Sequence, residues 1–412
     1  MCDMDVESLR GAWAGYGWLW LQPFWYIALV SAVFRYRAQI AAERRLFGVR
    51  LHRFGRLAAR TVLEGAAVGV VASGVSWLFG IRLSAAAGVA VWICSVAGAL
   101  VRPRFACVAY ACAGVGVAHA VATVLPAAGV SGVWPDVVRE LRSIDMASLL
   151  ALVALLHAAE AVLVTAGGAK TAMPLFLMGR RGKVIGGFAM HRLWAVPLVL
   201  AVSPSQGWAT AWMPFPVLLG YAERTTADLP ARKARRSAVR LAAYAVVTGG
   251  FAAAAAFWRS AAVGFAGALA AAVLHEALIR LSHREERLRA PLFVHDGRGV
   301  RVLAVVPGSP AEAMGIRTGE VISKVNGITV RDRRGLYAAL WSNPTLCRLE
   351  VLDEQGQVRF LQRPFYAGEQ HQLGLVLCPD EDAPYLEEID GAGWKVLFGI
   401  PRRTASGPRR PG

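Results

Sequence analysis

The stretch "GSPAEAMGIRTGEVISKVNG", residues 308–327, decides the fold of the C-terminal part of the chain. Ser309 is a good helix N-cap, Pro310 suits the first helical position, and Glu312 lies three residues after the cap. This capping box, followed directly by a glycine that can end a helix, predicts one short helix over residues 310–314. The stretch is typical of a small water-soluble module, although most of the chain is apolar.

The residues on both sides of this stretch predict a small mixed α+β domain. The strand Glu320–Val325 leads into a tight Asn-Gly turn. Asp332 is placed to cap a second helix, on which Leu336 and Leu340 share one face. The remaining β-branched and alternating segments predict strands at residues 300–306, 348–352, 358–362 and 373–377.

The segment "VVPGSPAEAMGIRTGEVISKVNG" resembles the signature of PDZ domains, and the resemblance covers about residues 291–380. PDZ domains bind extended peptides, often C-termini, by adding a strand to a sheet edge. Their carboxylate-holding loop has the form x-Φ-G-Φ, where Φ is apolar. The opening "HDGRGV" fits that form poorly, whereas "HQLGLVL" at 371–377 fits better. The resemblance therefore implies a circularly permuted PDZ domain whose peptide-binding strand comes last in the sequence.

The expected groove lies between this last strand and the second helix. Gly374 would let the chain approach the peptide carboxylate closely, so Gly374→Glu should block binding while the fold survives. The alternative is that Leu373–Leu377 is an ordinary closing strand without a ligand. The expected groove residues are Gln372, Leu373, Gly374, Leu375, Val376, Leu377, Leu336 and Leu340.

The composition of the whole chain is that of a membrane protein. Of its 412 residues, 56% are hydrophobic and 18% are charged. Residues 1–283 contain enough long apolar segments for about seven to nine helical spans, with the Pro-interrupted segment 191–221 as a hairpin of two helices. The clearer candidate spans are Ala12–Phe34, Val62–Gly80, Leu83–Leu100, Phe105–Ala128, Met146–Gly168, Leu241–Trp258 and Ala261–Leu281.

The net charge of +17 follows from arginine-rich loops rather than from a nucleic-acid-binding surface. If segment 191–221 is a hairpin, every basic loop falls on one side, which the positive-inside rule assigns to the cytoplasm. A basic linker at 284–290 then leads to a cytoplasmic PDZ domain at 291–390. The tail at 391–412, rich in Pro, Gly and Arg, is expected to be disordered.

Two polar motifs in the apolar part raise the question of chemistry. "HEALI" contains His275 and Glu276, but Ile279 stands where a zinc-binding helix needs its second histidine. His157 and Glu160 share one helical face and form either a polar clasp to another span or a relay site. The six cysteines show no disulfide or zinc spacing. The sequence therefore predicts no catalytic residues, no metal site and no cofactor.

Stretches spread over nearly the full length resemble the MinJ family of cell-division topological determinants in Bacillus-type bacteria. They are "QPFWYIALVSAVF", "AERRLFGVR", "LHAAEAVLV", "KTAMPLFLMGRRGKVIGGFAMHRLWAVPLVL", "HEALIRLSHREERLRAPLFVHDGRGVRVLAVVPGSPAEAMGIRTGEVISKVNG" and "RPFYAGEQHQLGL". The resemblance implies a multi-pass cell-membrane scaffold, not an enzyme, enriched at septum and poles. MinD-like and DivIVA-like division proteins, a peptide ligand and membrane lipids are the implied partners. The alternative is a PDZ-bearing membrane regulator of envelope proteolysis, secretion or transport.

Overall fold

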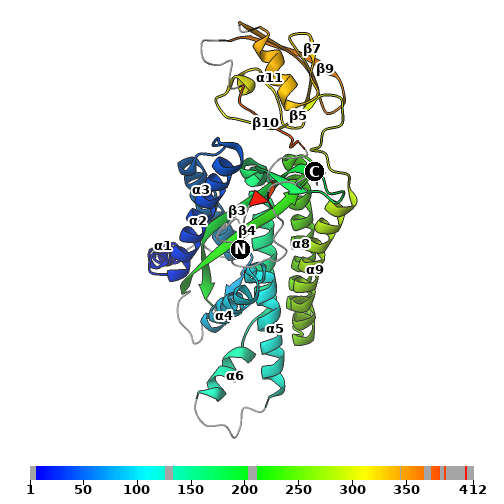
Figure 1. Cartoon of the computed structure of the whole chain (residues 1–412). Helices are drawn as coiled ribbons and strands as arrows, with labels where there is room; N and C mark the ends of the chain where they lie inside the picture. The colour runs from blue at the N-terminus through cyan, green and yellow to red at the C-terminus, as the bar shows by residue number, and fades with distance from the viewer. Residues whose placement is uncertain are drawn as a thin grey trace.

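The computed structural model describes residues 6–125, 133–202, 211–343, 345–365, 373–380, 385–386 and 404–405. Long helices surround a β-sheet in the larger part, and a second, smaller sheet domain lies at one end of it (Figure 1). The smaller domain is the C-terminal module that the sequence predicts.

Apart from the charged helix at residues 134–142, the helices of the larger part form in apolar segments of the chain. They are α1 (Val6–Leu19), α2 (Pro23–Phe47), α3 (Phe54–Leu78), α4 (Ala85–Val101), α5 (Val108–Val124), α6 (Trp134–Arg142), α7 (Met146–Gly167), α8 (Pro230–Trp258) and α9 (Ala261–Leu288). The short 3₁₀ helices η1 (Pro103–Ala106) and η2 (Gly168–Thr171) precede α5 and follow α7.

Four of the described helices are long and apolar enough to cross a membrane, namely α3, α7 with η2, α8 and α9. The bent pair α1 and α2, with a 57° angle between them, would make a fifth. The helices α4 and α5 have 17 residues each, short of the roughly 20 that a straight span needs. The described part of the chain thus holds fewer candidate spans than the sequence suggested.

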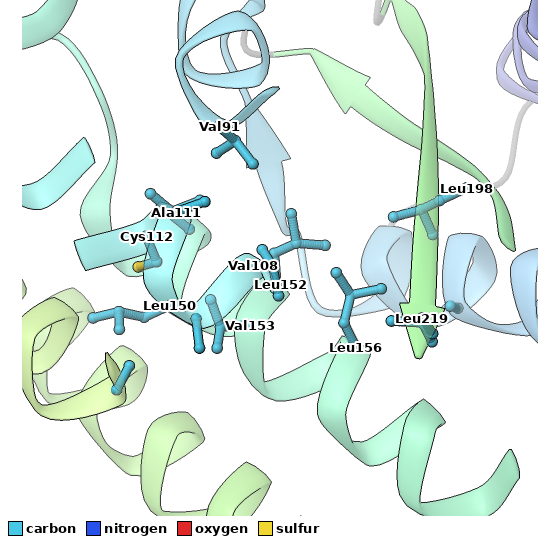
Figure 2. Packing of buried hydrophobic residues seen from close by; sticks show 14 of the residues in the cluster. Val91, Val108, Ala111, Cys112, Leu150, Leu152, Val153, Leu156, Leu198 and Leu219 are labelled. Atoms are coloured by element: carbon cyan, nitrogen blue, oxygen red, sulfur yellow. The ribbon is translucent and has the colours of Figure 1, made fainter. Parts of the chain in front are cut away.

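Helix α7 is the centre of the largest hydrophobic core. Leu150, Leu152, Val153 and Leu156 are fully buried, although they point to different sides of the helix. Figure 2 shows them between α5, the strands and the α8–α9 pair. A helix that is apolar all round lies in a protein core or in a membrane, and here the neighbouring elements bury the polar His157 and Glu160 of α7 inside the bundle.

The expectation of a helical hairpin at 191–221 is wrong, because residues 191–202 and 212–221 lie in two long antiparallel strands, β3 (Val184–Val202) and β4 (Trp212–Thr225). Pro197 pairs with Pro216 across the ladder, and Pro214 lies two residues earlier. Three prolines would remove amide donors from the inside of a helix. Both strands are largely buried, so their apolar runs mimic spans.

Strand β3 is the centre of the larger sheet, where it pairs with β1 (Arg82–Leu83), β2 (Met173–Met178) and β4. Helix α3 crosses β3 so closely that a Cβ at Gly65 or Gly69 would lie nearer than 3.0 Å to Ala195 or Pro197. The short strands β11 (Tyr385–Leu386) and β12 (Thr404–Ala405) extend the same sheet beyond β2. The rest of the tail expected to be disordered lies outside the described residues.

The C-terminal domain confirms the locally predicted elements. It contains β5 (Val300–Val305), α10 (Pro310–Ala313), β6 (Val321–Val325), β7 (Ile328–Thr329), α11 (Arg333–Trp341), β8 (Leu346–Leu352), β9 (Val358–Pro364) and β10 (Leu375–Leu377). The sheet order is β10-β5-β6-β8-β9, with β7 paired to β6. Ser309 accepts a bond from the Glu312 amide, and Asp332 accepts one from Gly335, so both expected N-caps are present.

A separate cluster of apolar side chains joins this domain to the larger sheet. Phe293 is fully buried and packs edge-on against Phe188 of β3, with ring centroids 5.1 Å apart. Its carbonyl accepts a hydrogen bond of 2.8 Å from the Gly186 amide. Leu303 of β5 and Val376 of β10 belong to the same cluster. One face of the β5–β10 pair therefore packs against β3 rather than facing solvent.

Candidate peptide-binding site

Strand β10 is the edge of the smaller sheet, because β5 is its only partner among the described residues. Leu375 lies opposite Val305, and the Val306 amide donates to the Gly374 carbonyl at 2.8 Å. This pattern makes Leu375 and Val305 a non-hydrogen-bonded pair of an antiparallel ladder. The amide and carbonyl of Leu375 therefore point away from β5, toward the edge.

The preceding peptide unit is oriented in the same way. The Leu373 carbonyl accepts a hydrogen bond of 2.9 Å from the Ala311 amide at the start of α10. In a planar trans peptide the carbonyl and the next amide point in opposite directions. The amides of Gly374 and Leu375 are thus both directed outward, which is the arrangement that can bind a carboxylate and the main chain of an extended peptide.

The structure places a constraint on Gly374 in addition to the role that the sequence suggested for it. Its φ is +78°, and a Cβ at this position would lie closer than 3.0 Å to the side chain of Ser309. The glycine is needed so that the loop can pack against the N-cap of α10. The expectation that Gly374→Glu would leave the fold intact is therefore wrong, because the new side chain would displace the cap.

The structure divides the other expected groove residues between two cores. Four of them, Leu336, Leu340, Leu373 and Leu377, are buried in the domain's own core, whereas Val376 packs in the cluster against β3. Leu375 is half-buried and flanks the first core. Gln372 lies outside the described residues. The main chain of β10, rather than the α11 leucines, is the part of the expected groove that faces outward.

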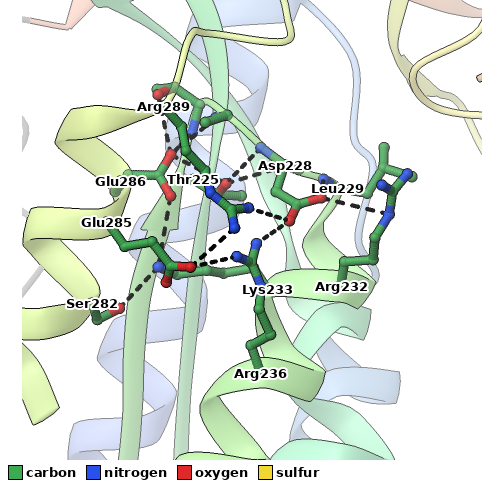
Figure 3. Close-up of polar contacts among 12 residues, drawn as sticks. Thr225, Asp228, Leu229, Arg232, Lys233, Arg236, Ser282, Glu285, Glu286 and Arg289 are labelled. Atoms are coloured by element: carbon green, nitrogen blue, oxygen red, sulfur yellow. Dashed lines mark hydrogen bonds and ion pairs between the residues drawn. The ribbon is translucent and has the colours of Figure 1, made fainter.

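A polar cluster at the domain-proximal end of α8 and α9 was missed by reasoning from sequence (Figure 3). Lys233 is buried, donates to Ser282 at 2.8 Å, and lies 3.5 Å and 3.6 Å from carboxylate oxygens of Glu223 and Glu286. Asp228, Arg236, Arg240, Glu285 and Arg289 continue the network. The network ties β4, α8 and α9 together where the chain leaves for the smaller domain.

The two polar motifs of the apolar part lie in one cluster. His157 of α7 and His275 of α9 have ring centroids 5.3 Å apart, and Cys107 lies between their Nε2 atoms. Glu276 pairs with Arg280 at 3.0 Å and with Arg104 at 3.3 Å. The histidines lie far from Cys107 in the sequence, so no spacing motif could have indicated this group.

Comparison with known proteins finds two kinds of similarity. A family model described as a PDZ domain matches residues 301–352. The cell division topological determinant MinJ of Bacillus subtilis is 30% identical over 224 residues, which cover 50% of this chain and 55% of that protein. The probable cell division topological determinant MinJ of Lacticaseibacillus paracasei is 37% identical over 86 residues, which cover 21% of this chain and 23% of that protein.

The chain thus spans about half the length of the Bacillus relative and less of the other. No solved structure matches the chain. The matched family model covers β5 to β8, the elements that the capping and turn signals predict. Together with the apolar helices, these matches make the chain a MinJ-like protein that carries a PDZ domain.

Proposed function

We propose that this chain is a membrane-anchored scaffold that uses its PDZ domain to recruit division-site placement proteins to the septum and the poles. The observation that carries the proposal is the similarity to a cell division topological determinant over half of the chain. A PDZ domain is an interaction module, so the proposed role is binding rather than catalysis.

The proposed peptide site is the outer edge of β10. Its support is the outward direction of the Gly374 and Leu375 amides, which follows from the bonds that their neighbours make to α10 and β5. The domain is proposed to be circularly permuted. In support, β10 comes last in the domain's sequence but lies beside β5, its first strand. A bound peptide would continue the sheet as a further strand.

The PDZ domain is proposed to face the cytoplasm in a multi-pass protein. The ends of α8 and α9 nearest to it carry a high density of arginine, and short basic segments stay on the cytoplasmic side. MinD-like and DivIVA-like proteins are the proposed partners, by the family resemblance. Both would reach a PDZ domain only on the inner face of the membrane.

A fluorescent fusion of the full chain, imaged in dividing bacterial cells, tests the scaffold role. The proposal expects signal at septa and poles, together with a tagged MinD-like protein that loses this position when the chain is removed. Uniform membrane signal, with the MinD-like protein placed normally in cells without the chain, would refute the scaffold role.

A further inference from the structure

Three side chains with metal-binding atoms converge inside the helical part, outside the PDZ site. They are Cys107, directly before α5, His157 of α7 and His275 of α9. Their ligand atoms all lie within 4.8 Å of one another. We propose that Cys107, His157 and His275 bind one transition-metal ion, with Zn²⁺ as the occupant, and so join three helices of the bundle.

The distances match those of a metal centre. The Cys107 Sγ lies 3.4 Å from His157 Nε2 and 3.7 Å from His275 Nε2. Zinc bonds of about 2.3 Å to sulfur and about 2.0–2.1 Å to nitrogen hold tetrahedral ligands about 3.5 Å apart. Only small side-chain shifts are therefore needed to bring all three atoms to bonding distance from one ion.

The Nδ1 atoms of both histidines have hydrogen-bond partners of their own. These partners leave the Nε2 lone pairs of both rings directed toward the same point. His157 Nδ1 lies 2.8 Å from the Val153 carbonyl, which can only accept, so this nitrogen carries the proton and Nε2 has a lone pair. Tyr110 donates to Glu276 at 2.9 Å, so its oxygen is free to accept from His275 Nδ1 at 3.4 Å. Such partners behind metal-bound histidines fix the ring and its tautomer.

Hydrogen bonds alone cannot give every polar atom of this cluster a partner. A thiol has one hydrogen, so Cys107 can donate to His157 or to His275, but not to both. One imidazole nitrogen is then left without a partner in the bundle interior. A metal ion accepts all three lone pairs, and the thiol proton passes to solvent when the thiolate binds. Thiolate with two imidazoles is a donor set that suits Zn²⁺.

The charge of a bound ion must also be compensated inside the bundle. Zn²⁺ with one thiolate carries a net charge of +1, which would be costly in an apolar bundle. Glu160 is buried one helical turn after His157 on the same face of α7, and a bound cation would favour its ionised, charge-compensating form. The three protein ligands leave one coordination position to a water molecule.

The full chain, purified in detergent and stripped with a chelator, provides the test. After dialysis of the stripped protein against Zn²⁺, we expect one Zn²⁺ per chain. Co²⁺, used as a spectroscopic probe, should give the intense near-ultraviolet band of a cobalt–thiolate bond. Cys107→Ser should abolish that band, and His157→Gln or His275→Gln should lower Zn²⁺ affinity at least about tenfold. Zinc should also raise the unfolding temperature of the wild type but not of Cys107→Ser.

Matched controls separate binding from folding. Cys112→Ser removes a buried thiol of α5 that lies outside the group, and His119→Gln removes a buried imidazole that lies near the Leu141 carbonyl. Both should keep Zn²⁺ binding and the cobalt band, with helical circular dichroism equal to that of the three ligand variants. No zinc uptake by the wild type, uptake of Cu⁺ alone, or equal loss in the controls would overturn the assignment.

Discussion

At the residue scale, Gly374 couples the edge strand to the cap of α10. Both its positive φ and its contact with Ser309 exclude a side chain, whereas Gly356 in the β8–β9 turn has the same φ, +79°, and open space around it. We expect Gly356→Ala to cost about 1 kcal/mol, from the backbone alone. Gly374→Ala should cost about 3 kcal/mol, because strain and overlap add.

Hydrogen exchange of the full chain, measured for peptides from 300–377, gives the local loss of stability in Gly356→Ala and in Gly374→Ala. A double variant in which Ser309→Gly accompanies Gly374→Ala should recover part of the loss. Equal protection in Gly374→Ala and Gly356→Ala would show that the contact with the α10 cap does not matter.

Asp296, also at this scale, makes the PDZ domain sensitive to acid. Burial alone would raise the pKa of this carboxyl, but hydrogen bonds from Arg298 and the charge of Arg301 lower it to about 2. A folded-state pKa below the ordinary value stabilises the fold above about pH 4, and this stability is lost as the pH falls toward 2. Because the carboxylate is partly exposed, we expect its charge to contribute about 1 kcal/mol to the stability of the folded state.

Unfolding of wild type and Asp296→Asn, compared between pH 7 and pH 2, measures this contribution. The asparagine variant should be less stable at pH 7, and the difference should disappear near pH 2. A difference that stays constant over this range would contradict the role of the Asp296 charge.

At the element scale, the buried Lys233 holds β4, α8 and α9 together. Without its ammonium group, Glu223 and Glu286 would both lose the cation that pairs with them. We expect Lys233→Met to destabilise the full chain by about 3 kcal/mol, since an unpaired buried charge remains. Arg235→Ala, on the exposed side of α8, should stay within about 0.5 kcal/mol of wild type.

Circular dichroism of the full chain during thermal unfolding distinguishes the two substitutions. Adding Glu286→Gln to Lys233→Met should recover stability, because it removes one of the two opposing charges. Equal midpoints for Lys233→Met and Arg235→Ala would show that the ion cluster is not what joins the elements.

Elements defined by local signals could be predicted from the sequence, whereas those defined by long-range contacts could not. The caps at Ser309 and Asp332 depend on neighbouring residues, so α10 and α11 were predicted correctly. The strands β3 and β4 were taken for helices, because a long buried apolar run has no periodicity that separates the two. Pro197, Pro214 and Pro216 were the available signal against helices.

The candidate sites likewise depend on contacts between residues that are far apart in the sequence. Cys107 lies 50 residues from His157 and 168 from His275, so only the fold brings them together. The "HEALI" motif lacks its second histidine within α9, and the structure supplies one from α7 instead. The direction of the Leu375 amide likewise depends on the register with β5, which the sequence does not state.

At the scale of the whole molecule, the sheet domain is attached to the helical part by one face, and its edges have no strand partner among the described residues. Val376 and Leu303 pack toward β3, and the smaller sheet ends at β10 on one side and at β9 on the other. A partner strand could therefore add at either edge. We assign recruitment to β10 alone, since hydrogen bonds to the start of α10 and to the end of β5 direct two adjacent amides outward there.

A matched pair of proline substitutions separates the two edges. Leu375 and Phe360 each lie in a non-hydrogen-bonded pair, so proline at either position removes an amide that points outward and no ladder bond. Phe360 is 70% exposed, which makes it a suitable control on β9. Leu375→Ala, which keeps the amide, shows how much of any effect belongs to the side chain.

The most direct test of the account is the recruitment of a tagged MinD-like protein to septa in cells that express these full-length variants at equal levels. We predict that Leu375→Pro lowers septal recruitment at least about tenfold, which corresponds to about 1.4 kcal/mol of binding free energy. Phe360→Pro should recruit as wild type does, and Leu375→Ala should retain most of the signal. Normal recruitment by Leu375→Pro, with the protein intact in the membrane, would contradict the central claim that the β10 edge binds the partner.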